Sequence, residues 1–464
     1  MDSNLRAKAS PNYSGRLTRH NSLESFQNHH LPPLRTDVDR SYPMALDEKA
    51  NKFESMASTP TLEAQEEGKG GGKGSGNNHG VGHDHDGGVD IYDPNRPKLG
   101  PKQRLHHLTW AWFTLPMSTG GLSLLIYAQP HQFPGLRAMG TVVYAINIVI
   151  YLSLLALMVA RFVIHSGDMS KSLKHPREAL FVPTLFLATA TVITSSDRYA
   201  IPKNDVGLVW AVQGAFWAYV AVTLVLAIGQ YSYIFAAHSY GLQTMMPTWI
   251  LPIFPIMLSG TIASVIAETQ PAAAAMSILV AGLSCQGLGF AVAVLMYAHM
   301  VGRLMQSGLP NREHRPGLFM CVGPPAFTAL AIIGMAKGIP ASANQDHLGM
   351  PVDLTTIRTL ALISAIFLWS LSLWWFGIAV VAVVQAVPKY FHLGWWAMVF
   401  PNTGFVLATI AIGKELDNEG VLWFATGLSI CLLGMYLFVL FCNIKAVITQ
   451  DIMYPGRDED VEDH

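Results

Sequence analysis

The stretch PTWILPIFPIMLSGTIASVIAE, residues 247–268, decides the fold. It is long and apolar enough to cross a bilayer, which takes about 20 residues, yet three of its residues are proline. Its last residue, Glu268, is the only Asp, Glu, Lys or Arg between Val206 and Gly302. Since no soluble core explains so long an uncharged stretch, the sequence predicts several membrane-spanning helices, some of them interrupted by proline.

The composition of the whole chain agrees with this reading. Of 464 residues, 51% are hydrophobic and only 13% are charged, about half the charged fraction of a soluble domain. About ten segments are long enough to span a membrane. The chain has no phosphate-binding glycine loop followed by lysine, no HExxH and no paired-cysteine spacing. We therefore expect no enzyme activity, no cofactor, no resident metal and no nucleic-acid partner.

Prolines fall only in alternate segments. The odd-numbered segments contain Pro116, Pro183, Pro247, Pro252, Pro255, Pro324, Pro325 and Pro401, whereas the even-numbered runs 137–165, 207–238, 272–305, 359–387 and 420–449 contain none. Proline kinks a helix and frees backbone polar groups, which inside a membrane must face protein or a water-filled cavity. The predicted fold is therefore an all-α polytopic membrane protein, with about ten transmembrane helices as five helical hairpins around a central pore lined by the odd-numbered helices.

The two ends of the chain differ from this core. Residues 1–100 are polar and end in a glycine-rich stretch, which predicts a disordered cytosolic tail, and 451–464 form an acidic cytosolic tail after the transport domain 101–450. Twelve Lys and Arg on one side against six on the other predict that both termini are cytosolic. The tail residues His79, His83 and His85 are read as part of a solvated linker rather than a metal site. The sequence RHNS, residues 19–22, resembles a basic-directed kinase site.

Hydroxyl and amide side chains gather in the odd-numbered segments. Such groups stabilise an anion weakly at many points, which suits an ion that must also leave. The alternative is that they bond to their own backbone or hold helices together. The predicted pore-lining and anion-binding residues are Ser118, Thr119, Gly120, Thr191, Thr194, Ser259, Thr261, Asn402 and Thr403.

Charged residues at the ends of the odd-numbered segments form a second set. Arg198, Lys337 and Lys414 are predicted to lie at the outer mouth, where they would attract anions, with snorkelling at the interface as an equal alternative. Glu268 is a candidate to carry a coupled proton. A contact between subunits or an exposed loop position is the alternative for Glu268.

Two stretches resemble a known family. Residues 107–121, HLTWAWFTLPMSTGG, resemble the opening span of fungal malic-acid transporters. Residues 395–401, WWAMVFP, resemble the ninth-span motif of the tellurite-resistance/dicarboxylate transporter family, which includes plant slow-type anion channels and fungal sulfite exporters. The resemblance extends over about residues 100–450.

This resemblance implies a fold and a gate. The family fold is five helical hairpins around a pore, assembled as a homotrimer with one pore per protomer. Phe400 corresponds to the phenylalanine that occludes the family's pore, and ordinary aromatic packing is the alternative for this ring. Kinases acting on the tails open the channel branch of the family, which makes Ser22 a candidate site for a regulatory kinase.

Three functions follow from these observations. The leading hypothesis is a plasma-membrane transporter of malate, succinate and similar C4-dicarboxylate anions, driven by the anion gradient and membrane potential or by proton coupling. The second is a channel or exporter for small anions such as chloride, nitrate or sulfite. The third, a membrane sensor without net transport, agrees less well with kinks concentrated in alternate helices.

Overall fold

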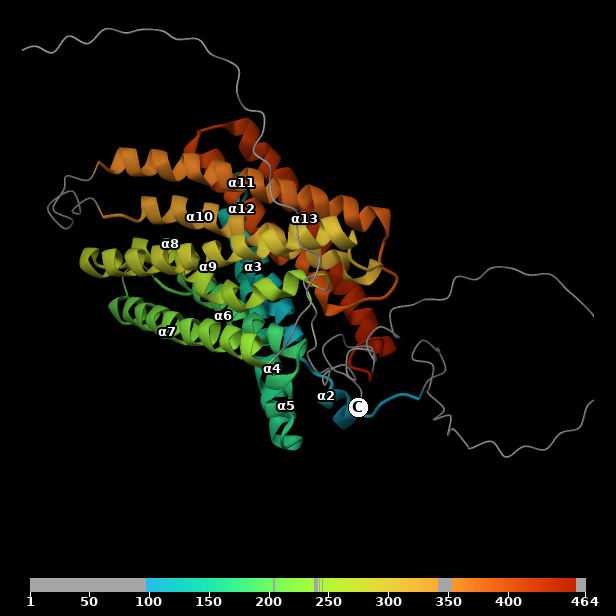
Figure 1. Cartoon of the computed structure of the whole chain (residues 1–464). Helices are drawn as coiled ribbons and strands as arrows, with labels where there is room; N and C mark the ends of the chain where they lie inside the picture. Colours follow the sequence, from blue (N-terminus) through green and yellow to red (C-terminus); the bar gives the residue numbers. More distant parts are fainter. Residues whose placement is uncertain are drawn as a thin grey trace, which may run out of the picture. The chain divides into compact units, whose positions relative to one another are not determined.

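The computed structural model describes residues 97–202, 205–237, 241, 243, 245–340 and 353–455. Every secondary-structure element in this part of the chain is a helix (Figure 1). The predicted N-terminal tail up to residue 96, including the histidines and the kinase motif, and the acidic end beyond residue 455 lie outside the described residues.

Each odd-numbered segment consists of a 3₁₀ helix that continues into a short α-helix. The five pairs are η1 (Trp110–Phe113) with α3 (Thr114–Ala128), η2 (Glu178–Phe181) with α6 (Val182–Tyr199), η4 (Pro247–Ile253) with α8 (Phe254–Ile266), η6 (Arg312–Val322) with α10 (Gly323–Lys337), and η8 (Leu393–Met398) with α12 (Phe400–Glu415). In α6, α8, α10 and α12 a proline occupies one of the first two helical positions, where its missing N–H costs least. The predicted kinks are therefore junctions between the two helix types.

The even-numbered segments are long uninterrupted α-helices of 29 to 36 residues. They are α4 (Leu136–Ile164), α7 (Val206–Ala237), α9 (Ala272–Ser307), α11 (Leu354–Gln385) and α13 (Glu419–Thr449), and shorter elements are α2 (Pro101–His106), α5 (Asp168–Lys174) and η5 (Ala267–Thr269). Figure 1 shows α7, α9 and α11 running in roughly the same direction. In these long helices, 17% to 33% of the most apolar stretch is buried, compared with 61% to 94% in four of the odd-numbered segments.

The short helices form a closed ring within the described residues. α3 packs against α6, α6 against α8, α8 against α10, α10 against α12, and α12 against α3. Each long helix packs against the short helix that precedes it and against the next one around the ring. This confirms the prediction of five hairpins with the proline-containing helices inside and the smooth helices outside.

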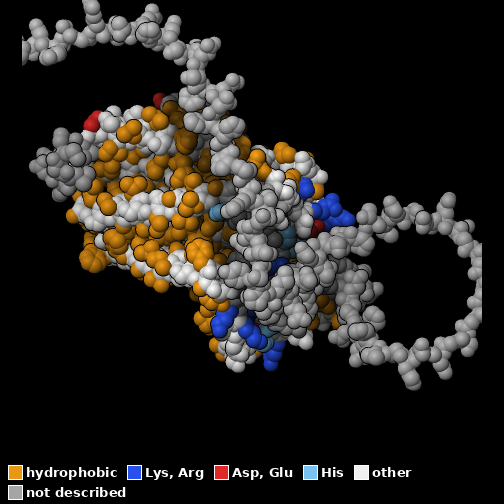
Figure 2. All heavy atoms as spheres, in the orientation of Figure 1, with side chains coloured by type: hydrophobic (Ala, Val, Ile, Leu, Met, Phe, Trp, Pro, Cys, Tyr) orange, Lys and Arg blue, Asp and Glu red, His pale blue; other side chains and the backbone are white. Residues whose placement is uncertain are grey.

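The outer helices expose large apolar side chains. Val149, Val225, Phe367 and Phe441 are each 65% to 73% exposed, and apolar atoms cover much of the visible helix surface (Figure 2). Among the described residues, nine helices are long and apolar enough to cross a membrane. The first predicted span is η1 with α3, which is not among the nine but belongs to the inner ring. The protein is therefore a multi-pass α-helical membrane protein.

Tyrosines of the outer helices bond backbone carbonyls at or near the junctions. The hydroxyl of Tyr219 on α7 donates to the carbonyl of Pro255 over 2.8 Å, and that of Tyr297 on α9 donates to the carbonyl of Cys321 over 2.7 Å. Both hydroxyls are buried. Because lipid offers no hydrogen-bond partner, the broken inner helices depend on these side chains.

Candidate functional site: an anion path through the inner ring

Two small cavities lie inside the ring of short helices. The first, here named the threonine cavity, includes Thr191, Thr194, Thr261 and Thr403 in a wall to which α3, α6, α8, α10 and α12 all contribute. The second, the junction cavity, lies among the junctions and includes Thr114, Thr184, Pro247 and Pro401. Each measures about 20 Å³, which is room for about one water molecule.

Phe400 lines both cavities. It is 2% exposed, and its ring stacks on that of Phe327 with the centroids 5.0 Å apart and the planes at 26°. Phe327 packs directly against Gly404, because a Cβ added to Gly404 would lie 2.7 Å from the Phe327 ring. A Cβ added to Gly121 would lie 3.4 Å from the Phe400 ring. Phe400 is therefore part of the wall of both cavities, whereas Phe327 lines the threonine cavity alone.

The four threonines of the threonine cavity differ in their hydrogen bonding. The hydroxyls of Thr191, Thr194 and Thr403 donate to carbonyls of their own helices over 2.8, 2.7 and 3.1 Å, as the alternative reading of the sequence expects. The Thr261 hydroxyl has no partner among the described residues. The described lining of both cavities includes no Asp, Glu, Lys, Arg or His. The described walls are therefore uncharged, and the Thr261 hydroxyl is available for a hydrogen bond.

The other five predicted candidates lie in the inner helices but line neither cavity. Ser118 and Ser259 are fully buried and their hydroxyls have no partner among the described residues. Thr119 bonds to the carbonyl of Leu115 and to the hydroxyl of Tyr436 on α13. The side-chain nitrogen of Asn402 donates to the carbonyl of Met398 over 2.7 Å, while its oxygen lacks a partner in the part of the chain described.

Gly120, the ninth candidate, faces neighbouring helices. A Cβ added to it would lie 2.8 Å from the amide nitrogen of Asn147 on α4. Asn147 is fully buried, and neither amide atom has a partner among the described residues. Gln286 on α9 similarly reaches inward and donates to the Thr328 hydroxyl over 2.7 Å. Neither amide was predicted from the sequence, although each is a rare polar residue in an apolar, proline-free run.

The three predicted outer-mouth cations lie at one end of the ring. Arg198 and Lys337 are close enough to Lys414 to interact with it electrostatically. Arg198 pairs with Glu268 over 3.0 Å, and the Lys414 ammonium donates to the carbonyl of Ala128 over 2.9 Å. Lys337 pairs with Glu415. The three cations therefore lie near one another, and two of the three charges are offset by carboxylates.

Residues 107–444 match the voltage-dependent anion channel family, SLAC1. The chain belongs to this family. It is 36% identical over 368 residues to a malic acid transport protein of Schizosaccharomyces pombe, covering 78% of this chain and 84% of that one. It is 24% identical over 347 residues to the sulfite efflux pump SSU1 of Trichophyton rubrum, covering 74% of this chain and 91% of the pump. The resemblance seen in the two motifs is thus confirmed over most of the chain.

Membership of the anion channel family decides the class of function. The matched proteins are named as transport proteins, and the family is one of channels, which confirms the prediction that the protein is not an enzyme. Anions are the class of ion that the family conducts. The neutral path and the cations at one end of the ring agree with anion transport.

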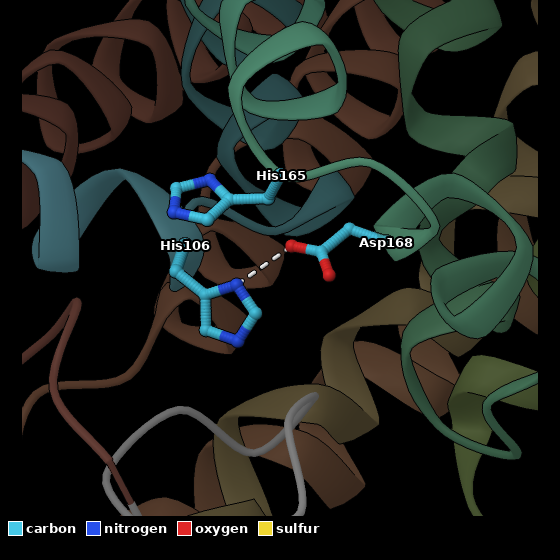
Figure 3. Close-up of side chains that lie close together, drawn as sticks. All are labelled: His106, His165 and Asp168. Atoms are coloured by element: carbon cyan, nitrogen blue, oxygen red, sulfur yellow. Dashed lines mark hydrogen bonds and ion pairs between the residues drawn. The ribbon is translucent and has the colours of Figure 1, made fainter.

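The protein also has a cluster of polar side chains away from the two cavities. His106, His165 and Asp168 place one ligand atom each within 4.8 Å of one another, and Figure 3 shows them side by side between α2 and the turn after α4. His106 is hydrogen-bonded to Asp168 over 2.6 Å, and the guanidinium of Arg161 lies 3.9 Å from the same carboxylate oxygen. Because the Asp168 carboxylate already contacts both His106 and the buried Arg161 guanidinium, we assign the cluster to anchoring α2 and α5 rather than to binding a metal.

Proposed function

We propose that the protein carries malate and related C4-dicarboxylates, such as succinate, across the plasma membrane. The substrate rests on the likeness to the malic acid transport protein, which extends over most of both chains. A second relative at 33% identity over 79% of this chain is also named a putative malic acid transport protein. Both are more similar to this chain than the sulfite efflux pumps, at 24%. We further propose that the protein assembles as a homotrimer with one anion path per protomer, and that both termini are cytosolic.

In this proposal Phe400 is the gate, and the observation that carries it is the position of this ring between the two cavities. Neither cavity has room for more than about one water molecule, so a dicarboxylate passes only after the ring moves. The threonines, Ser118, Ser259 and Asn402 then offer hydroxyl and amide donors as inner helices shift. Many weak contacts favour passage over tight binding.

The membrane potential sets the direction of an uncoupled dianion. A charge that crosses 100 mV is worth about 2.3 kcal/mol, so a dianion is driven out of a negative-inside cell by about twice that. Uptake therefore requires co-transported protons or the monoanion. Glu268 is the proposed proton carrier, and its carboxylate is paired with the Arg198 guanidinium over 3.0 Å. If Glu268 carries the proton, Glu268→Gln flattens the pH dependence of malate uptake, and an unchanged profile removes the residue from the mechanism.

Current through the purified protein in a planar bilayer tests the substrate and the gate together. With malate on one side and chloride on the other, the reversal potential identifies the ion that permeates. Phe400→Ala is expected to raise the current. Phe405→Ala is the matched control, because Phe405 lies in the same helix, is 2% exposed and stacks on Trp369 and Phe376 rather than lining a cavity. Equal malate uptake by liposomes with and without protein would refute malate transport.

A channel or exporter for small anions is the second candidate. It is favoured by the family description and by the small size of both cavities. A reversal potential set by chloride, or currents with nitrate or sulfite but not malate, would establish it. A kinase acting on Ser22 is a further proposal that lies outside the described residues, and a phosphomimetic Ser22→Asp that leaves the current unchanged would oppose it.

A further inference from the structure

A groove of about 260 Å³ lies on the outer surface, away from the anion path. One wall is the last third of α7, from Val225 to Ile234, and the other is formed by the end of α5, η2 and the start of α6. The groove is lined almost entirely by apolar side chains. Its rim is open to the surroundings, because Val225 is 72% exposed and Leu173 is 40% exposed.

The groove reaches the level of the lipid headgroups. α7 has 32 residues, about 48 Å at 1.5 Å per residue, and this exceeds the hydrocarbon thickness of about 30 Å. Tyr233 lines the groove near the end of α7, and tyrosine favours the membrane interface. The apolar part of the groove therefore faces acyl chains while its end faces headgroups.

Three cations flank that end. Lys171, Lys174 and Arg177 are exposed, and none has an ion-pair partner in the described part of the chain. Both nearby carboxylates are buried and already paired, Asp168 with His106 and Glu178 with Arg161. Figure 2 shows Lys and Arg side chains gathered over α5, at the lower edge of the apolar surface.

The lining of the groove includes the buried side-chain amide of Gln230. Gln230 lines the groove and its amide nitrogen donates to the carbonyl of Ala179. Its side-chain oxygen is buried and accepts no hydrogen bond from the described residues. Gly229, next to it, leaves open space where a Cβ would lie. The groove is thus a mostly apolar hollow that contains the Gln230 amide, and the three cations lie next to its lining residues Leu173 and Pro176 or within two positions of them in the chain.

We propose that this groove binds an anionic phospholipid, with one acyl chain between α7 and the η2–α6 segment and the headgroup phosphate against Lys171, Lys174 and Arg177. The apolar walls match the chain, and the unpaired cations match the phosphate. This site is independent of the substrate and of the gate.

Native mass spectrometry of the purified full chain, titrated with phosphatidylserine or phosphatidylcholine, tests the proposal. We expect one phosphatidylserine retained per chain in preference to phosphatidylcholine. Gly229→Phe fills the hollow and should abolish that retention, whereas Gly214→Phe, at a similarly open position of α7 outside the groove, should not. Replacing both Lys171 and Lys174 by Gln should weaken binding about thirty-fold, and Lys389→Gln, an exposed lysine elsewhere, should have no effect.

Three results would overturn the proposal. Equal retention of the two lipids would exclude recognition of the negative headgroup. Loss of lipid from Gly214→Phe as well as Gly229→Phe would show that the groove is not the site. A change in oligomeric mass of Gly229→Phe, without a change in bound lipid, would show that a second copy of the chain covers the groove.

Discussion

Replacing Phe327 by Leu tests the gate without touching Phe400. The two rings stack with centroids 5.0 Å apart, and such a pair contributes about 0.5–1.5 kcal/mol beyond its buried area. If Phe400 must leave this stack before an anion passes, removing the stacking contact lowers the free-energy barrier to transport by that amount. Since about 1.4 kcal/mol is a factor of ten in rate, Phe327→Leu should raise the transport rate about two- to twelvefold.

The assay is malate efflux from liposomes that contain equal amounts of folded protein, checked by thermal unfolding of each variant. Phe376→Leu is the control, because Phe376 stacks on Phe405 with centroids 5.6 Å apart and lines neither cavity. A transport rate for Phe327→Leu that is unchanged or lower, with the protein still folded, would contradict the claim that Phe400 must leave this stack before an anion passes. So would an equal increase in the Phe376 variant, since it would indicate general loosening of the ring.

Gly121→Ala should lower the transport rate without unfolding the protein, because the added methyl would lie 3.2 Å from Thr403 in the threonine cavity; Gly434→Ala, with open space at its Cβ, should transport normally. Glu178→Gln should lower the free energy of unfolding by about 3–5 kcal/mol, since it removes the nearer of the two carboxylates that offset a buried guanidinium, whereas Glu268→Gln, which changes a part-exposed pair, should cost less than about 1 kcal/mol in the same thermal melts. Burial, followed by nearby positive groups, lowers the pKa of His107 from 6.5 to about 4, so the unfolded chain binds more protons in this range and the melting temperature should fall as pH drops from 6.5 towards 4. His107→Gln should flatten that decline, and an identical pH profile in the variant would oppose the assignment.

The path was only partly predictable from the residue types. Thr191, Thr194, Thr261 and Thr403 were all expected to face an anion, and all four line one cavity. Only Thr261 has a hydroxyl without a partner among the described residues. Whether a hydroxyl bonds to its own helix depends on its rotamer and on the neighbouring helix, and the sequence does not specify either.

The charged residues show a similar limit. Arg198 and Glu268 were assigned separate roles, yet they form one ion pair across 70 positions of the chain. Asn147 belongs to an outer helix and was not among the predicted site residues, but it is fully buried behind Gly120. Contacts between residues so far apart in sequence depend on how the helices rotate against one another.

The sequence by itself determined the membrane class, the alternation of inner and outer helices and the position of Phe400 at a proline junction. These properties are local, because apolar length selects a spanning helix and proline interrupts it wherever it occurs. Only the tertiary structure decided that the five inner helices close into a ring, that Phe400 stacks on Phe327 between two cavities, and that α5 and α7 leave a groove beside three cations. Each of these depends on side chains from distant segments meeting at one place, which packing specifies and no single stretch of sequence contains.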